Sequence, residues 1–77
     1  MTPAQCKMAR AGLSWSADHL SEKCGISRIT IARFESGLAV AAASIEAIHA
    51  ALNAAGADFT RKAGKIAVAV PDEAAAK

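Results

Sequence analysis

The chain has 77 residues, of which 53% are hydrophobic, and a formal net charge of +2. Much of the apolar content is alanine, which favours helix but adds little core volume, so we expect one small all-α body with a thin core. The mildly basic balance alone says almost nothing about nucleic acid. No stretch approaches the ~20 apolar residues of a membrane span, and no basic start followed by an apolar run marks a secretion signal. The composition therefore favours a soluble, cytoplasmic protein with no membrane partner.

Chemically reactive groups are sparse along the chain. Cys6 and Cys24 lack a metal-ligand spacing, and His19 and His49 lie about 30 residues apart with no acidic or thiol partner in spacing. The sequence contains no nucleophile and base arrangement and no glycine-rich phosphate loop. We therefore predict no enzyme activity, no cofactor and no bound metal, and we expect two free thiols in a reducing compartment.

The first helix is expected to begin at the N-terminus of the chain. Thr2 suits the N-cap position, and Pro3 suits the first helical position, where its missing N–H costs nothing. Met8 is the best core candidate of this segment. Gly12 is expected to end the helix as its C′ residue.

A second helix is predicted to begin after Ser16, which is its N-cap. Trp15 precedes the cap and can fold onto Leu20 as a hydrophobic staple. The helix is expected to end at Cys24 and Gly25, because a glycine readily adopts the positive φ that ends many helices.

A third helix is predicted over residues 28–36, with Ser27 as its N-cap and Gly37 after its end. Ile31 and Phe34 lie three residues apart and are expected to point inward. The opposite, outward side of this helix carries Arg28, Ile29, Ala32 and Arg33.

The remaining segments change in character along the chain. Residues 38–43 are an apolar loop without charge, and Ser44 is expected near the start of a fourth helix that ends at Gly56. Its inward residues are Ile45, Ile48 and Leu52. Residues 58–60 and 65–70 are candidate strands around a turn at residues 61–64, and residues 71–77 are expected to be a frayed tail. The predicted organisation is a helical domain (residues 1–56), a β-hairpin (57–70) and a tail (71–77).

One group of residues connects the second and third helices. Two short helices that cross at a sharp angle need a small residue where they meet, a glycine in the turn and apolar side chains converging beneath it. Ser21 is that small residue and Gly25 is the turn residue. The converging apolar residues are Leu20, Cys24, Ile26, Ile31 and Phe34. This geometry leaves the outer face of the third helix free to enter a major groove about 12 Å wide.

The run WSADHLSEKCGISRITIARFESG resembles the helix-turn-helix of the phage repressor and Cro type, the xenobiotic-response-element regulators. The resemblance covers roughly residues 7–59, and the segment LNAAGADF also resembles the end of the fourth helix in short bacterial members. It implies a lambda-repressor-like domain of four short helices with a small C-terminal β-hairpin. It also implies a sequence-specific transcriptional regulator that binds double-stranded DNA.

The resemblance assigns roles to individual residues. It places Ser27 and Thr30 where family members contact phosphates. The positions that read base edges are Arg28, Ile29, Ala32 and Arg33. An arginine there can pair bidentately with guanine, and an apolar side chain can contact a thymine methyl group. Arg10 and Glu35 match a pair that bridges the first and third helices in some relatives and orients the recognition helix.

The chain also departs from the family pattern. Ala17 stands where many relatives have a long polar residue that contacts a phosphate, and residues 38–43 lack the usual basic side chains. Because phosphate contacts supply most sequence-independent affinity, a monomer should bind weakly. We therefore expect a homodimer, formed through the edge strand at residues 65–70.

Two other interpretations remain open at this point. In one, the same fold is a protein-binding module, such as the antitoxin of a toxin–antitoxin pair or an adaptor. The apolar loop at residues 38–43 and the C-terminal strand would then be its contact surfaces. In the other, the domain packs as a helix-turn-helix but does not bind DNA. For the hairpin, the alternative to dimerisation is that Phe59 and Ile66 only cover the helical core.

Overall fold

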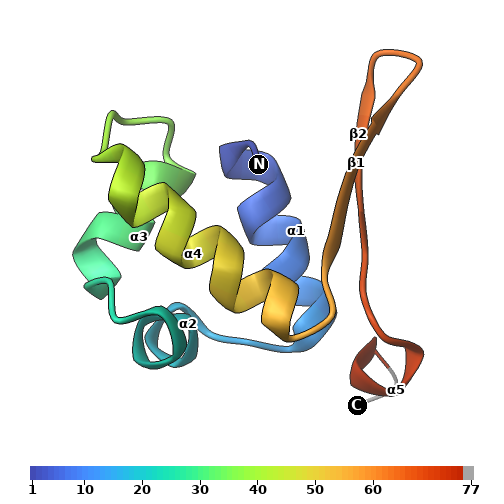
Figure 1. The fold of residues 1–77 in the computed structure, drawn as a ribbon, viewed down its shortest axis with the longest axis horizontal. Coiled ribbons are helices and arrows are strands. Elements are labelled where there is room, and N and C mark those ends of the chain that lie inside the picture. The colour runs from blue at the N-terminus through green and yellow to red at the C-terminus, as the bar shows by residue number, and fades with distance from the viewer. Residues whose placement is uncertain (76–77) are drawn as a thin grey trace.

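The computed structural model describes residues 1–75 of the chain. Its elements are, in order, α1 (Pro3–Leu13), α2 (Ala17–Cys24), α3 (Arg28–Glu35), α4 (Ala42–Ala54), β1 (Asp58–Lys62), β2 (Lys65–Ala69) and α5 (Asp72–Ala75). Figure 1 shows α1 to α4 as one body, with the hairpin beside α1 and its tip extending past the helices. The prediction of a mostly helical chain with a C-terminal β-hairpin is confirmed. None of the helices described here has the length and apolar character that crossing a bilayer requires.

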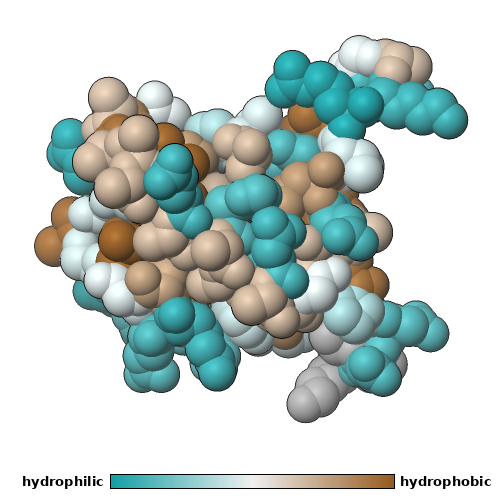
Figure 2. Space-filling view, in the orientation of Figure 1, coloured by the Kyte–Doolittle hydropathy of each residue, from teal (hydrophilic) through white to brown (hydrophobic). Residues whose placement is uncertain are grey.

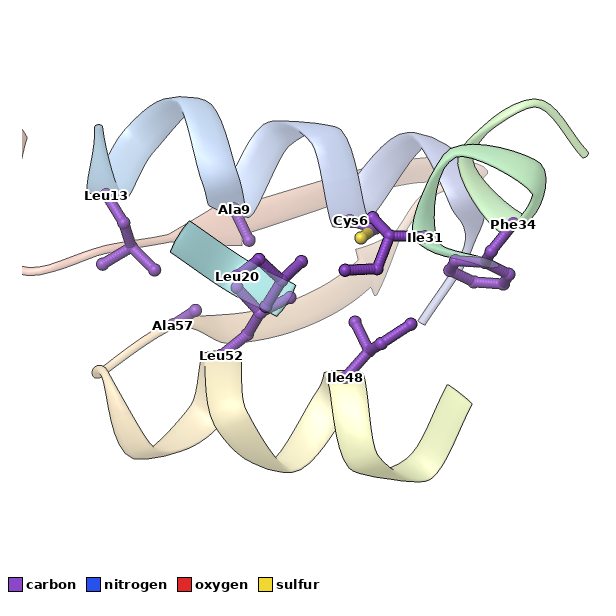
Figure 3. Close-up of a cluster of buried hydrophobic side chains, with 9 residues drawn as sticks. All are labelled: Cys6, Ala9, Leu13, Leu20, Ile31, Phe34, Ile48, Leu52 and Ala57. Atoms are coloured by element: carbon purple, nitrogen blue, oxygen red, sulfur yellow. The ribbon is translucent and has the colours of Figure 1, made fainter. Parts of the chain in front are cut away.

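The core forms where the four main helices converge (Figure 3). Its buried residues are Cys6, Ala9, Leu13, Leu20, Ile31, Phe34, Ile48, Leu52 and Ala57. The prediction of Met8 as a core residue is wrong, since this residue is 40% exposed. Met8 lies two residues after Cys6, which is roughly 200° around a helix, and therefore faces away from the side that packs.

The first helix begins as predicted and ends later. The Thr2 side chain accepts a hydrogen bond from the Gln5 amide, and the Gln5 side chain accepts one from the Thr2 amide, so the two form a capping box. Gly12 does not end α1, which continues to Leu13. The glycine has a packing role instead, because a Cβ atom there would lie 2.8 Å from a Val70 methyl group.

The termini of α2 and α3 follow the predicted signals. Ser16 and Ser27 each accept a hydrogen bond from the backbone amide three residues later, and Gly25 ends α2 with φ +73°. Trp15 is half-buried and packs against the core, and its ring centroid lies 4.8 Å from that of His19. The third helix ends at Glu35, one residue before the predicted end.

The fourth helix begins two residues earlier than Ser44 and has no side-chain cap. Ala41 occupies its N-cap position, and the following alanines extend the helix towards the N-terminus because alanine has the highest helix propensity. Ile48 and Leu52 are buried as predicted, and Ile45 packs half-buried against the same core.

The first strand of the hairpin is longer than predicted, the second ends one residue earlier, at Ala69, and the turn is tighter. Strands β1 and β2 pair antiparallel from Asp58↔Ala69 to Lys62↔Lys65, so only Ala63 and Gly64 remain as the turn. Both turn residues have positive φ, +53° and +74°. This is the type I′ geometry that matches the twist of the two strands. The prediction of a turn at residues 61–64 is wrong because a two-residue turn leaves Arg61 and Lys62 free to pair within β1.

The hairpin docks on its own helical core. Phe59, Val68 and Val70 pack against the buried cluster, and Ile66 is half-buried on the same face of β2 as Val68. The Gln5 side-chain amide donates to the Thr60 and Ala67 carbonyl oxygens, at 3.0 and 3.2 Å. One side chain of α1 therefore holds both strands.

The prediction of a frayed tail at residues 71–77 is wrong for residues 71–75, which the structure describes. Pro71 lies against Gly56, where a Cβ atom would come within 2.6 Å of the proline Cγ. Residues Asp72–Ala75 then form the helical turn α5, which contacts α1. The last two residues of the predicted tail, 76 and 77, lie outside the described part of the chain.

Candidate nucleic-acid interface

The turn between α2 and α3 is held from inside. The Ser21 hydroxyl donates a 2.6 Å hydrogen bond to the Ile26 carbonyl oxygen, which ties α2 to the turn that leads into α3. Leu20, Ile31 and Phe34 are buried beneath the turn. Cys24 and Ile26 pack half-buried against them. The predicted arrangement of a small residue, a glycine and converging apolar side chains is confirmed.

The outer face of α3 is free. Its exposed residues are Arg28, Ile29, Ala32 and Arg33, as predicted. This face forms one wall of a shallow, open depression of about 500 Å³. The depression is lined by Ala17, Arg28, Ile29, Ala32, Arg33, Ser36 and Leu38. Two guanidinium groups therefore border a small apolar surface that runs the length of the helix.

The hydroxyl groups at the start of α3 are engaged with each other. Ser27 Oγ donates to Thr30 Oγ1 at 3.0 Å and accepts from the Thr30 backbone N–H at 3.2 Å. Ser27 is exposed and Thr30 is half-buried. Both oxygens keep acceptor capacity, and the Thr30 hydroxyl keeps its own hydrogen to donate outward.

A carboxylate lies beside Arg28. Asp18 Oδ1 in the first turn of α2 is 3.4 Å from Arg28 Nε, and both side chains are largely exposed. An exposed pair of this kind contributes about 0–1 kcal/mol. Arg28 can therefore leave Asp18 for a stronger partner at little cost.

Behind the outer face, a partly buried ion pair fixes α3 to α1. Arg10 donates to both carboxylate oxygens of Glu35, from Nε at 2.8 Å and from Nη2 at 2.7 Å, and its Nη1 donates to the Trp15 carbonyl oxygen at 3.2 Å. Cys6 Sγ lies 3.1 Å from the same carboxylate and donates to it. Every hydrogen-bonding group of this cluster has a partner, as a buried polar network requires.

The charges in this cluster fix its protonation state. Burial alone would raise the pKa of Glu35, but hydrogen bonds from Arg10 and Cys6 and the positive charge of Arg10 outweigh it and hold the pKa below its ordinary value. Burial and the neighbouring carboxylate raise the pKa of the Cys6 thiol. The cluster is therefore an ionised Arg–Glu pair with a neutral thiol as a third donor.

The flanks of the depression carry no cation. Ala17 lies at one end, and Leu38, which is 51% exposed, lies at the other. The segment between α3 and α4 contains no charged residue. The depression thus offers partly apolar contacts, and Arg28 and Arg33 are the cations that line it.

Sequence reasoning missed three contributors to this region. Asp18 approaches Arg28 only through the packing of α2 against α3, which no pattern within one helix shows. Gln5 and Cys6 were not singled out, because their partners lie 29 to 62 residues away in the chain.

Other chemistries have little support in the described part of the chain. Within it, no group of three or more His, Cys, Asp or Glu side chains is arranged to hold a metal ion. Both cysteines are free thiols. Comparison with models of known protein families and with curated proteins finds no match.

Proposed function

We propose that this protein is a sequence-specific DNA-binding transcriptional regulator whose α2 and α3 form a lambda-repressor-like helix-turn-helix. The observation that carries the proposal is the contrast between the two faces of α3. Ile31, Phe34 and Glu35 are buried, whereas Arg28 and Arg33 border an open apolar surface. In this proposal α3 enters the major groove with that outer face.

The outer face of α3 has the chemistry that direct readout uses. Arg28 is assigned to a guanine, where a bidentate pair contributes ~1–3 kcal/mol of discrimination against the wrong base. Ile29 and Ala32 are assigned to thymine methyl groups, and Arg33 to a base or the backbone. Ser27 and Thr30 are assigned to the phosphates at the start of the helix.

The Arg10–Glu35 pair orients α3 in this proposal. A buried ion pair adds little net stability over an apolar replacement, but it fixes one geometry when every hydrogen bond is made. The two-point contact between Arg10 and Glu35 sets how α3 lies on α1. A base-reading side chain needs such a rigid support, because small displacements weaken bidentate contacts.

The experiment that tests the function is a selection from random double-stranded DNA with the purified protein at two salt concentrations. We expect enrichment of a defined motif, with an affinity that falls as salt rises. A protein that enriches no motif and shows no salt-dependent affinity at either concentration is not a DNA-binding regulator.

We further propose that the protein acts as a homodimer through β2. A single domain with an uncharged loop beside α3 has few phosphate contacts, and a second copy doubles them. β2 is an edge strand of a two-stranded sheet, so its outer backbone groups are free to pair with a second copy. We expect the wild-type protein to sediment as a dimer at micromolar concentration. A wild-type protein that sediments as a monomer at micromolar concentration contradicts this part.

A second candidate function is a protein-binding module, such as an antitoxin or an adaptor. It is favoured by the exposure of Ile29 and Leu38, at 70% and 51%, on the same depression. A gene for a small toxin adjacent to this one favours the antitoxin. An isolated gene beside a palindromic operator favours the regulator. The two functions also differ in whether DNA affinity depends on salt.

A further inference from the structure

The tip of the hairpin, residues 61–65, is a compact basic surface away from α3. It holds Arg61, Lys62 and Lys65, which are three of the nine Lys and Arg residues of the chain. All three side chains are exposed, and none forms a salt bridge with a carboxylate of the described residues. Figure 2 shows hydrophilic side chains gathered where the tip extends past the helices.

The two lysines face each other across the ladder. Lys62 and Lys65 are directly paired residues of β1 and β2, next to the two-residue turn. Residues paired in this way have their Cβ atoms about 5 Å apart, and like charges there destabilise a hairpin. The pair is therefore a local cost to the fold that an anion lying against both ammonium groups would offset.

No acid within the hairpin neutralises the tip. Asp58 is the only carboxylate of the two strands and lies at the other end of β1, four residues from Lys62. At about 3.3 Å per residue this is about 13 Å, which exceeds the Debye length of ~8 Å at physiological salt.

The tip is presented on a rigid support. The Gln5 amide holds both strands, and Val70 and Pro71 are packed closely against Gly12 and Gly56 at the base of the hairpin. Cations fixed in this way lose less conformational entropy on binding than the same side chains on a mobile tail. The hairpin therefore has the properties of a preorganised anion contact.

We propose that the hairpin tip is a second DNA-binding element, which contacts phosphates outside the groove that α3 occupies. The inference rests on the proposed function and supplies the phosphate contacts that the flanks of α3 lack. The largest extent of the molecule is 29 Å, which corresponds to about nine base pairs at 3.4 Å each. A duplex of one helical turn or more is therefore as long as the whole molecule. Figure 1 shows the tip and the α3–α4 loop both toward the top of the view, on opposite sides of the molecule.

The test compares two double variants that remove the same charge. Lys62→Gln with Lys65→Gln removes the tip cations, and Lys7→Gln with Lys23→Gln removes two exposed helical cations as a matched control. Binding to the selected DNA is measured over a range of salt concentrations. The slope of log K against log salt is negative, and each lost phosphate contact makes it shallower by about 0.9. We expect the slope of the tip variant to be shallower than that of the wild type by about 1–2. The control should keep the wild-type slope, and both variants should prefer the same motif.

The outcomes separate this inference from the function on which it rests. If the wild type binds DNA and the two double variants have equal slopes, the tip makes no phosphate contact and only this inference fails. If the wild type shows no salt-dependent DNA affinity, the proposed function fails first. Tip-dependent binding to vesicles of anionic lipid, with DNA affinity unaffected by the tip, would assign the surface to a membrane instead.

A second measurement does not depend on variants. DNA bound to the wild-type chain should protect Lys62 and Lys65 from acetylation of their amines, while Lys23 stays reactive. Equal reactivity of all three lysines with and without DNA overturns the inference.

Discussion

The α2–α3 pair and the β-hairpin differ in what holds them in place. The helix pair is fixed mainly by neighbours in sequence, namely the serine caps, Gly25 and the Ser21–Ile26 hydrogen bond. Distant contacts add to these: Arg10 and Cys6 both bond Glu35, and the buried side chains of the pair share the common core. The hairpin has a local type I′ turn, but its position depends on Gln5, which bonds its strands across 55 and 62 residues, and on Gly12, which admits Val70. The turn between α2 and α3 is thus held largely by local contacts, whereas the basic tip is held by contacts that are distant in the chain.

The largest expected effect comes from breaking the distant anchor of the helix pair. Glu35→Gln leaves Arg10 charged and partly buried without its carboxylate, and we expect a loss of about 2–3 kcal/mol in the free energy of unfolding. Urea denaturation at neutral pH measures it. Glu46→Gln, on the exposed side of α4, is the matched control and should change stability little.

The stability difference between the wild type and Glu35→Gln should depend on pH. The folded-state pKa of Glu35 is below its ordinary value of 4.5, so its ionisation stabilises the wild type above that value. The contribution is lost as pH falls through the lower, folded-state pKa. The stability difference between wild type and Glu35→Gln should therefore narrow at strongly acidic pH. A difference that is the same at neutral and acidic pH contradicts the ionised pair.

A smaller effect is expected when the anchor of the hairpin is removed. Gln5→Glu keeps the oxygen that caps α1 but replaces the amide donor with a carboxylate that faces the Thr60 and Ala67 carbonyl oxygens. We expect a loss of about 1–2 kcal/mol, and hydrogen exchange should show faster opening of the hairpin amides than of the α3 amides. Equal acceleration in both regions would mean that the hairpin and the helix pair are one cooperative unit.

The smallest effect is expected in the turn between α2 and α3. Gly25 has φ +73° and no atom within 4 Å of an added Cβ, so Gly25→Ala costs only backbone strain, about 1 kcal/mol. Gly25→Asn should cost less, because asparagine tolerates this conformation. Thermal melting of both variants distinguishes strain from packing, and equal losses would contradict the strain argument.

The difference between local and distant contacts also explains which features could be predicted from the sequence. The caps at Thr2, Ser16 and Ser27 and the inward pair Ile31 and Phe34 are local or periodic signals, and all were predicted correctly. The packing role of Gly12 was not, because its partner Val70 lies 58 residues later. A glycine near a helix end looks the same in sequence whether it terminates the helix or admits a side chain from elsewhere.

The candidate site shows the same pattern. Periodicity placed Arg28, Ile29, Ala32 and Arg33 on one exposed face. The resemblance, and not the spacing, joined Arg10 to Glu35, and the structure brings that pair into contact. The contact of Asp18 with Arg28 could not be predicted, because it depends on the crossing of two helices, which no pattern within either helix encodes.

The most direct test of the central claim is the base preference of an Arg28→Ala variant across a randomised operator library. We expect one position of the selected motif to lose its guanine preference while the others keep theirs. Asp18→Asn, which frees Arg28 from its exposed partner, should tighten binding and keep that preference. An Arg28→Ala protein with the same preference as the wild type at every position would contradict direct readout by α3.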